Sequence, residues 1–265
     1  MKNDLLTIGK FTVHGYGLMI GIGIIAAYLV AEYRAKRKNL DYNKIFDLTL
    51  WCLIGGLLGA KILYYLTEIK DILADPSLLL DIGNGFVVYG GIIFGILAGF
   101  LFCKRHQLNF FRYFDLTMPS IALAQGFGRL GCFLAGCCYG IETKSAFGIV
   151  FHNSDFAPNG VRLVPTQLIS SGLDFLNFLV LVLLSKGVMA DGQVAGFYLI
   201  FYSVGRFILE FYRGDIERGN VGPLSTSQFI SIFLFLFGCV FTVIRGRMAK
   251  KEIENAEMEN EMKRE

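Results

Sequence analysis

Long apolar runs separated by short polar segments are the dominant pattern along the chain. Each run approaches the about 20 residues that an α-helix needs to cross the hydrocarbon core of a bilayer. The seven runs lie at Tyr16–Tyr33, Phe46–Thr67, Phe86–Cys103, Phe114–Leu134, Gln167–Ser185, Val194–Tyr212 and Thr226–Ile244. The pattern predicts an all-α integral membrane protein with these seven transmembrane helices, in one membrane domain over residues 1–247.

Basic residues are unevenly distributed among the connections. They cluster after the first, third and last runs, whereas the turn after the fifth run carries a single lysine, Lys186. The clusters are Arg34, Lys36, Arg37, Lys38 and Lys44; Lys104, Arg105 and Arg112; and Arg245, Arg247, Lys250 and Lys251. Because cytoplasmic loops carry an excess of Lys and Arg, we expect the N-terminus outside and the C-terminus in the cytoplasm.

Two segments differ from the spanning runs. Residues 139–165 form the longest connection, and we expect them to form a small extracytoplasmic cap between the fourth and fifth spans. Within this connection Phe147–Phe151 is apolar and β-branched enough for a strand, and Ala157–Gly160 has the composition of a turn. Residues 248–265 carry mixed charge, which predicts a solvated cytoplasmic tail.

The composition agrees with a membrane protein. The 265 residues are 54% hydrophobic with a mean hydropathy of +0.53, whereas soluble domains are usually about 45–50% apolar. The formal net charge of +3 gives no indication of nucleic-acid binding. The first residues lack the pattern of a cleaved signal peptide, so we expect the first run to remain as an anchor.

One charged residue interrupts the fourth run. Arg129 lies in a glycine-rich segment, Gly126–Gly140, that is otherwise apolar enough for a bilayer. A charged side chain at the bilayer centre costs roughly 2.5–3.5 kcal/mol on insertion scales, so it is retained where it faces a cavity, a partner or a ligand. The segment therefore predicts a polar site inside the membrane domain.

The sixth run carries a second set of polar residues. Tyr202, Arg206, Glu210 and Arg213 recur at helical spacing and share one face. An Arg206–Glu210 ion pair is a purely structural explanation, but one glutamate cannot neutralise two buried arginines. A phosphodiester would complete the set, because planar guanidinium groups bind phosphate through paired hydrogen bonds.

The cysteines allow several interpretations. Cys132, Cys137 and Cys138 have the spacing CxxxxCC, which lacks the paired CxxC of zinc sites, so no metal and no cofactor are predicted. Small apolar packing, a redox pair and a nucleophilic or acyl-carrying thiol remain open. Pairing of Cys132 with Cys137 requires that Gly136 break the helix.

Several motifs, in their order along the chain, resemble those of the prolipoprotein diacylglyceryl transferases. They are His14-Gly-Tyr-Gly-Leu-Met19, Gly55-Gly-Leu-Leu-Gly-Ala-Lys61, Tyr89-Gly-Gly91, Gly128-Arg-Leu-Gly131, Pro165-Thr-Gln167, Gly205-Arg-Phe-Ile-Leu-Glu-Phe-Tyr-Arg213 and Ser225-Thr-Ser-Gln228. Each motif is weak alone, but the resemblance covers nearly the whole chain. It implies transfer of a diacylglyceryl group from phosphatidylglycerol to the lipobox cysteine of a preprolipoprotein signal peptide, in the bacterial cytoplasmic (inner) membrane.

The resemblance also implies roles for particular residues. Phosphatidylglycerol would be bound by Arg129 and by Gly128, Tyr16, Tyr202 and Arg213. Arg206 and Glu210 would act in catalysis, and Tyr89 would assist proton transfer, although a phenol with a pKa of about 10 is a poor base at neutral pH.

The chain departs from the family pattern at several polar positions. Tyr89 replaces the histidine of a His-Gly-Gly motif, Cys132 replaces an asparagine, and residues 135–137 replace Asn-Gly-Glu. Val164 replaces a histidine before the Pro-Ser-Gln motif. These departures predict a divergent, cysteine-rich variant. The alternatives are a related transferase with another acceptor, a membrane thiol-redox protein, and a protein that binds or transports lipid without chemistry.

Overall fold

The computed structural model describes residues 4–8, 11–80, 83, 85–187, 190–215 and 219–263. The chain forms two compact units. The first contains residues 1–30 and 114–265, and the second contains residues 31–113. α1 (Gly15–Arg37) and α5 (Phe110–Ala135) each contribute to both units.

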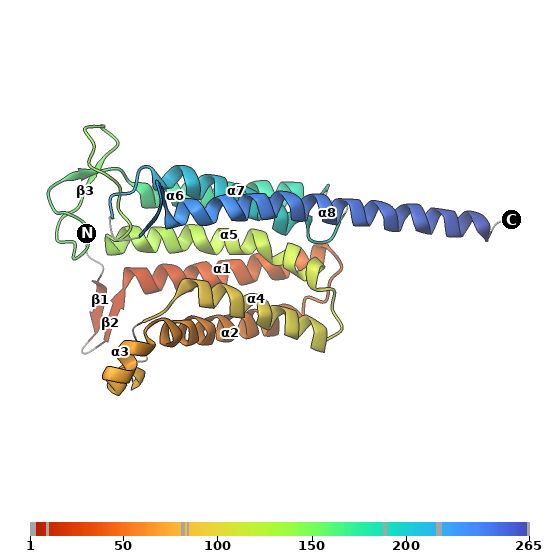
Figure 1. Ribbon diagram of the computed structural model, residues 1–265, viewed down its shortest axis with the longest axis horizontal. Coiled ribbons are helices and arrows are strands. Elements are labelled where there is room, and N and C mark those ends of the chain that lie inside the picture. The colour runs from red at the N-terminus through yellow and green to blue at the C-terminus, as the bar shows by residue number, and fades with distance from the viewer. Residues whose placement is uncertain are drawn as a thin grey trace. The chain divides into compact units, whose positions relative to one another are not determined.

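Helices account for most of the described residues (Figure 1). Besides α1 and α5 they are α2 (Lys44–Thr67), α3 (Ile69–Ala74), the short 3-10 helix η1 (Pro76–Leu80), α4 (Val88–Arg105), α6 (Thr166–Leu184), α7 (Gln193–Glu210) and α8 (Thr226–Met262). Three small antiparallel pairs accompany them: β1 (Asp4–Ile8) with β2 (Phe11–His14), β3 (Ile149–Val150) with β4 (Arg162–Leu163), and β5 (Asn220–Val221) with β6 (Leu224–Ser225). Every predicted apolar run coincides with a helix, whereas α3, η1 and the β1–β2 hairpin were not predicted.

Within the part of the chain that the structure describes, five helices are long and apolar enough to cross a membrane: α1, α2, α4, α6 and α8. The protein is therefore a helical integral membrane protein. The other two predicted spans, α5 and α7, do not meet the same hydropathy criterion within the described residues. They contain Arg129 and the pair Arg206 and Glu210, respectively, so the helices that fall short are the ones carrying the candidate site.

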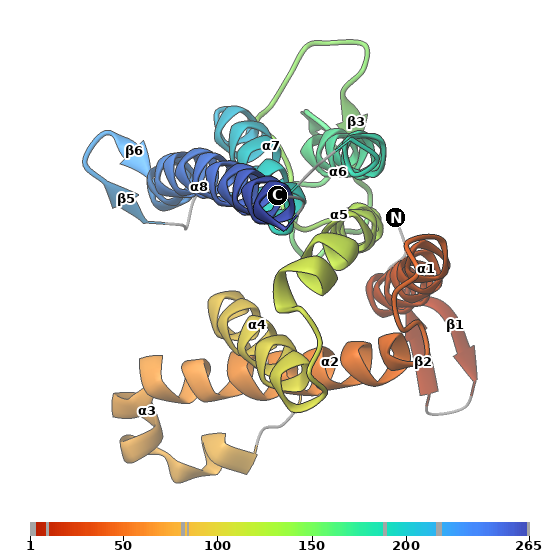
Figure 2. The same ribbon diagram turned by 90° about the vertical axis from the view of Figure 1, so that its right-hand side faces the viewer.

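In the first unit α5, α6, α7 and α8 run side by side (Figures 1 and 2). Small residues permit the close approaches: a Cβ atom at Gly238 of α8 would lie 3.1 Å from the carbonyl oxygen of Gly196 of α7. A Cβ at Gly131 of α5 would lie 3.1 Å from the carbonyl oxygen of Tyr16 of α1. Glycine at such contacts lets helix backbones pack closely in a membrane.

In the second unit α2 packs against α4. A Cβ at Gly59 would lie 2.6 Å from the carbonyl oxygen of Gly90, and one at Gly55 would lie 2.6 Å from Ala98 Cβ. The Gly55-Gly-Leu-Leu-Gly59 sequence therefore serves helix packing. Tyr89 lies in the first turn of α4 and is 50% exposed.

The connection between α5 and α6 has its own small core. Phe151, Ala157 and Leu163 are buried together, and β3 pairs with β4. The strand predicted at Phe147–Phe151 is confirmed in shortened form, as Ile149–Val150. At the other end of the chain α8 continues without a break into the predicted tail, whose described residues are almost all exposed.

Candidate functional site

A cavity of about 350 Å³, counting the open space at its mouth, lies between α5, α6 and α7 of the first unit. Its lining combines charged, amide and apolar side chains: Arg129, Ser170, Leu173, Asp174, Asn177, Phe201, Tyr202, Gly205, Arg206 and Leu209. The predicted residues Arg129 and Arg206 thus reach one cavity from two helices, as the sequence interpretation required.

Hydrogen bonds hold the Arg206 guanidinium in place, but they do not use all of its nitrogen atoms. Its Nη2 lies 2.7 Å from the Glu210 carboxylate and donates a hydrogen bond of 2.8 Å to Ser227 Oγ. Its Nη1 is buried and has no hydrogen-bond partner among the described residues. The predicted Arg206–Glu210 pair is therefore present, and one guanidinium nitrogen remains available to a ligand.

Ser227 is positioned by the start of α8. Ser225 and Gln228 form a capping box, in which the Ser225 hydroxyl accepts from the Gln228 backbone N–H at 3.2 Å and the Gln228 side chain accepts from the Ser225 N–H at 3.1 Å. A capping box fixes the first turn of a helix. The Ser-Thr-Ser-Gln motif therefore orients the Ser227 hydroxyl that accepts the hydrogen bond from Arg206.

The α6 side of the cavity is polar. Asp174 and Tyr202 lie close enough to Arg129 to interact with its charge, while no ion pair within 4.0 Å of Arg129 is present among the described residues. Asn177 is buried, and neither polar atom of its amide has a partner among those residues. A buried amide without partners is costly, so a bound polar group would satisfy it.

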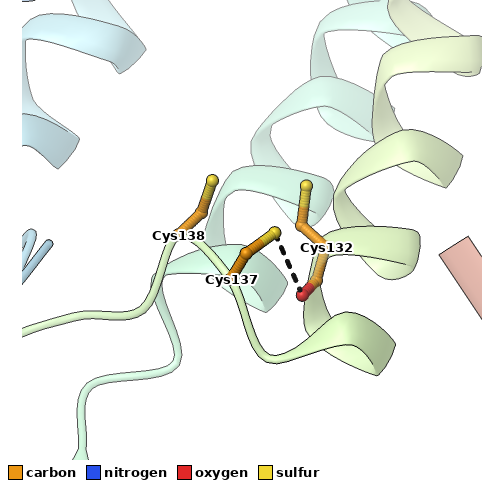
Figure 3. A group of neighbouring side chains, drawn as sticks. All are labelled: Cys132, Cys137 and Cys138. Atoms are coloured by element: carbon orange, nitrogen blue, oxygen red, sulfur yellow. Dashed lines mark hydrogen bonds between the residues drawn. The ribbon is translucent and has the colours of Figure 1, made fainter. Parts of the chain in front are cut away.

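A second cluster lies where α5 ends. The helix stops at Ala135, Gly136 has a left-handed φ of 78°, and the chain turns back toward the helix (Figure 3). The sulfur atoms of Cys132, Cys137 and Cys138 lie within 4.8 Å of one another. Hydrogen bonds from the neighbouring thiols, and then the charge of Arg213, hold the pKa of Cys138 below its usual range.

The start of α6 and the end of α7 hold this turn. Gln167 Nε2 donates to the Cys137 carbonyl oxygen at 2.8 Å, and Thr166 Oγ1 donates to that of Cys138 at 2.9 Å. Backbone bonds of 3.0 Å from Gly214 N to Tyr139 O and 2.9 Å from Ile141 N to Tyr212 O join the following residues to the segment just after α7. The Pro-Thr-Gln motif thus positions the cysteines.

The remaining predicted residues have different surroundings. Arg213 forms a two-pronged pair with Asp215, at 2.8 and 2.6 Å, outside the cavity lining. Tyr16 interacts electrostatically with Arg129 and the cysteine cluster. A Cβ atom at Gly128 would meet nothing within 4 Å, so this glycine leaves open space beside Arg129. Tyr89 belongs to the second unit.

Comparisons with known proteins agree with one another. Residues 3–244 match the family model described as prolipoprotein diacylglyceryl transferase. The chain is 47% identical over 248 residues to the phosphatidylglycerol–prolipoprotein diacylglyceryl transferase of Clostridium tetani, covering 93% of this chain and 99% of the relative. It is 47% identical over 253 residues to transferase 2 of Clostridium perfringens (95% and 98%), and 34% identical over 245 residues to that of Finegoldia magna (92% and 95%). The chain belongs to the prolipoprotein diacylglyceryl transferase family.

Sequence reasoning missed several polar residues around the cavity of this family member. Ser170, Asp174 and Asn177 lie on one face of α6, and Ser227 lies on α8. The signal for the first three was present, because residues spaced by four and three positions share a helical face. Ser227 lies in the Ser225-Thr-Ser-Gln228 motif, but the motif gave it no individual role, because that role depends on Arg206 of another helix.

Proposed function

We propose that the protein transfers the diacylglyceryl group of phosphatidylglycerol to the lipobox cysteine thiol of a preprolipoprotein, with release of glycerol phosphate. The observation that carries this proposal is the convergence of Arg129 and Arg206 on one cavity, where Arg206 Nη1 has no partner among the described residues. A phosphodiester supplies the oxygen acceptors that such a pair of cations requires.

In the proposed reaction the arginines act on the leaving group. The C3–O bond of the diacylglyceryl unit breaks as the acceptor sulfur attacks C3, and negative charge grows on the departing phosphate. Arg129 and Arg206 stabilise that charge, and a cavity poor in water strengthens their effect. Glu210 and Ser227 keep the Arg206 guanidinium oriented toward the phosphate.

The other predicted residues support binding in this proposal. Tyr202 lines the cavity, Gly128 leaves room for the lipid, and Tyr16 lies near Arg129. Arg213 braces the turn after α5 through Asp215 and the cysteine cluster. The role in proton transfer that the resemblance implies for Tyr89 stays a prediction.

We place the enzyme in the bacterial cytoplasmic membrane with seven spans, counting α5 and α7 with the five apolar helices. In this arrangement the N-terminus lies outside, residues 139–165 form an outer cap, and residues 248–265 form a cytoplasmic tail. The basic clusters around the ends of α1 and α4 and within α8 support the orientation.

The test uses purified protein, phosphatidylglycerol labelled in its headgroup and a lipobox peptide. We expect labelled glycerol phosphate to be released and the peptide mass to rise by one diacylglyceryl group. Both signals should be lost in Arg129→Ala. Release without a change in peptide mass would indicate another acceptor or hydrolysis, and lipid binding without release would indicate a binding protein.

A further inference from the structure

The three sulfur atoms at the end of α5 have the spacing of a metal site. A zinc ion bound by three thiolates at about 2.3 Å requires its sulfur ligands to lie about 4 Å apart. The Sγ atoms of Cys132, Cys137 and Cys138 already lie within 4.8 Å of one another, on one side of the turn (Figure 3). Only small side-chain adjustments are therefore needed to bring all three onto one ion.

The backbone around the cluster is fixed in an uncommon conformation. Cys138 has a φ of 60°, in the left-handed region that residues other than glycine rarely adopt. The bonds from Thr166 and Gln167 to the carbonyls of Cys138 and Cys137 hold this conformation. Since ligands fixed before binding lose less entropy on binding, the turn is well suited to hold an ion.

The charges around the cluster also suit a metal thiolate. A divalent zinc ion with three thiolates carries one net negative charge. Arg213 donates a hydrogen bond to the Cys138 sulfur, and Arg129 lies one turn before Cys132 on α5. These two cations offset the negative charge of the complex.

The cluster adjoins the donor cavity. Arg129 lines that cavity and precedes Cys132 by three residues, which is about 4.5 Å along a helix axis. Cys137 and Cys138 are only half-buried, so their side chains are not sealed in the core. An ion held here would lie beside the phosphate of a bound lipid.

Two carboxylates beside the arginines are already engaged, and Asp174 of α6 is the carboxylate that lines the cavity. Glu210 is paired with Arg206, and Asp215 is paired with Arg213. Attack on carbon nevertheless requires a thiolate, because the protonated thiol is a poor nucleophile. A metal ion supplies this activation, since a thiol that coordinates it is deprotonated outright.

We propose that Cys132, Cys137 and Cys138 bind a zinc ion whose fourth coordination position takes the acceptor thiol as a thiolate. This inference rests on the proposed function, because the acceptor is the thiol substrate named there. Thiolate ligands favour zinc and monovalent copper, and zinc sites in catalysis commonly combine three protein ligands with one open position. The site therefore recognises the acceptor by its sulfur.

The proposed step balances without a redox partner. The acceptor thiol releases its proton to solvent as it binds zinc. A sulfur electron pair then forms the C–S bond to C3, and the C3–O bond breaks with its electron pair on the glycerol phosphate oxygen. Zinc keeps its oxidation state throughout, and the thioether product, which carries no charge, leaves the metal.

The first test measures the metal directly on the full-length protein purified under reducing conditions. We expect stoichiometric zinc by elemental analysis. We also expect thiolate-to-metal charge-transfer bands after exchange into Co²⁺. The variant Cys132→Ser/Cys137→Ser/Cys138→Ser should lose both signals. Cys239→Ser, which removes a cysteine of α8 outside the cluster, is the matched control and should keep them.

The second test adds the acceptor. A lipobox peptide should shift the Co²⁺ bands, and the same peptide with serine in place of its cysteine should not. Removing zinc should lower peptide lipidation by about 100-fold or more, as expected when a metal supplies several kcal/mol of stabilisation. Adding zinc back should restore the lipidation.

The inference would be overturned if the wild-type protein retained no metal after zinc loading, if the three cysteines formed a disulfide, or if the peptide thiol left the Co²⁺ bands unchanged. Full transfer by metal-free protein would also overturn it, while leaving the proposed function intact. Conversely, bands that respond to the peptide in a protein that never cleaves phosphatidylglycerol would support the metal site and count against the proposed function.

Discussion

Arg206 has a structural role and a proposed functional role, and a single substitution would remove both at once. Its guanidinium neutralises Glu210, and its unpartnered Nη1 is offered to the donor phosphate. Removing one partner of a buried ion pair leaves an uncompensated charge, whereas replacing both with apolar residues is often neutral. A pair of variants can therefore separate the two roles.

We expect Arg206→Met to lower the free energy of unfolding by about 3–5 kcal/mol, because the Glu210 carboxylate is left buried alone. Arg206→Met/Glu210→Leu should regain most of this stability and still fail to release glycerol phosphate. Denaturant unfolding and the labelled-lipid assay measure the two quantities. Transfer at the wild-type rate by the double variant would show that Arg206 is structural only.

Two neighbouring glycines of α5 provide a second comparison. A Cβ at Gly126 would lie 2.6 Å from Cδ1 of Phe175, whereas one at Gly128 would meet nothing within 4 Å. We expect Gly126→Ala to destabilise the protein by about 1–3 kcal/mol through overpacking. Gly128→Ala should unfold like the wild type but show a raised KM for phosphatidylglycerol. An unchanged KM would remove Gly128 from the lipid site.

At the scale of elements, the turn after α5 decides where the cysteines lie. Gly136 has a φ of 78°, and a Cβ added there would collide with the Ser154 hydroxyl. The sequence analysis expected Cys132 to reach Cys137 only if Gly136 ended the helix. In the structure the helix does end there.

Gly136→Ala and Gly160→Ala form a matched pair for this turn. Both positions are left-handed, with φ of 78° and 77°, but a Cβ at Gly160 meets nothing within 4 Å. Each should cost about 1 kcal/mol for the backbone alone. Only Gly136→Ala should lose further stability and lower the rate of transfer. Equal losses in the two variants would mean that the collision with Ser154 is relieved without moving the cysteines.

The helices were predictable because long apolar runs specify them directly. The β1–β2 hairpin and α3 were not, because short segments carry little periodicity. The three cysteines were identified in the sequence, but whether they meet was left open, because the conformation of Gly136 and a bond from Gln167, 30 residues away from Cys137, bring their sulfurs together. Residue spacing contains neither piece of information.

For the whole molecule, the charged end of α8 should be dispensable. Its ion pairs are exposed, as in Lys250–Glu254 at 3.7 Å, and such pairs contribute little to stability. We expect deletion of residues 248–265 to leave unfolding and transfer unchanged.

A longer deletion, of residues 242–265, serves as the control. It removes Thr242, which is buried and lies where a side chain on Gly196 of α7 would collide with it. The longer deletion should destabilise the protein, because α7 loses part of the surface against which it packs. Equal stability of the two truncated proteins would argue against this packing.

The unbroken course of α8 has a practical consequence for imaging. A helix of 37 residues extends about 55 Å, well beyond the about 30 Å of hydrocarbon that it crosses. A chain of 29.6 kDa is otherwise mostly enclosed by a detergent micelle, which obscures the orientation of each particle. Because the projecting helix is continuous with the helix inside the micelle, a rigid domain fused in helical register to its end would serve as an alignment marker for electron microscopy.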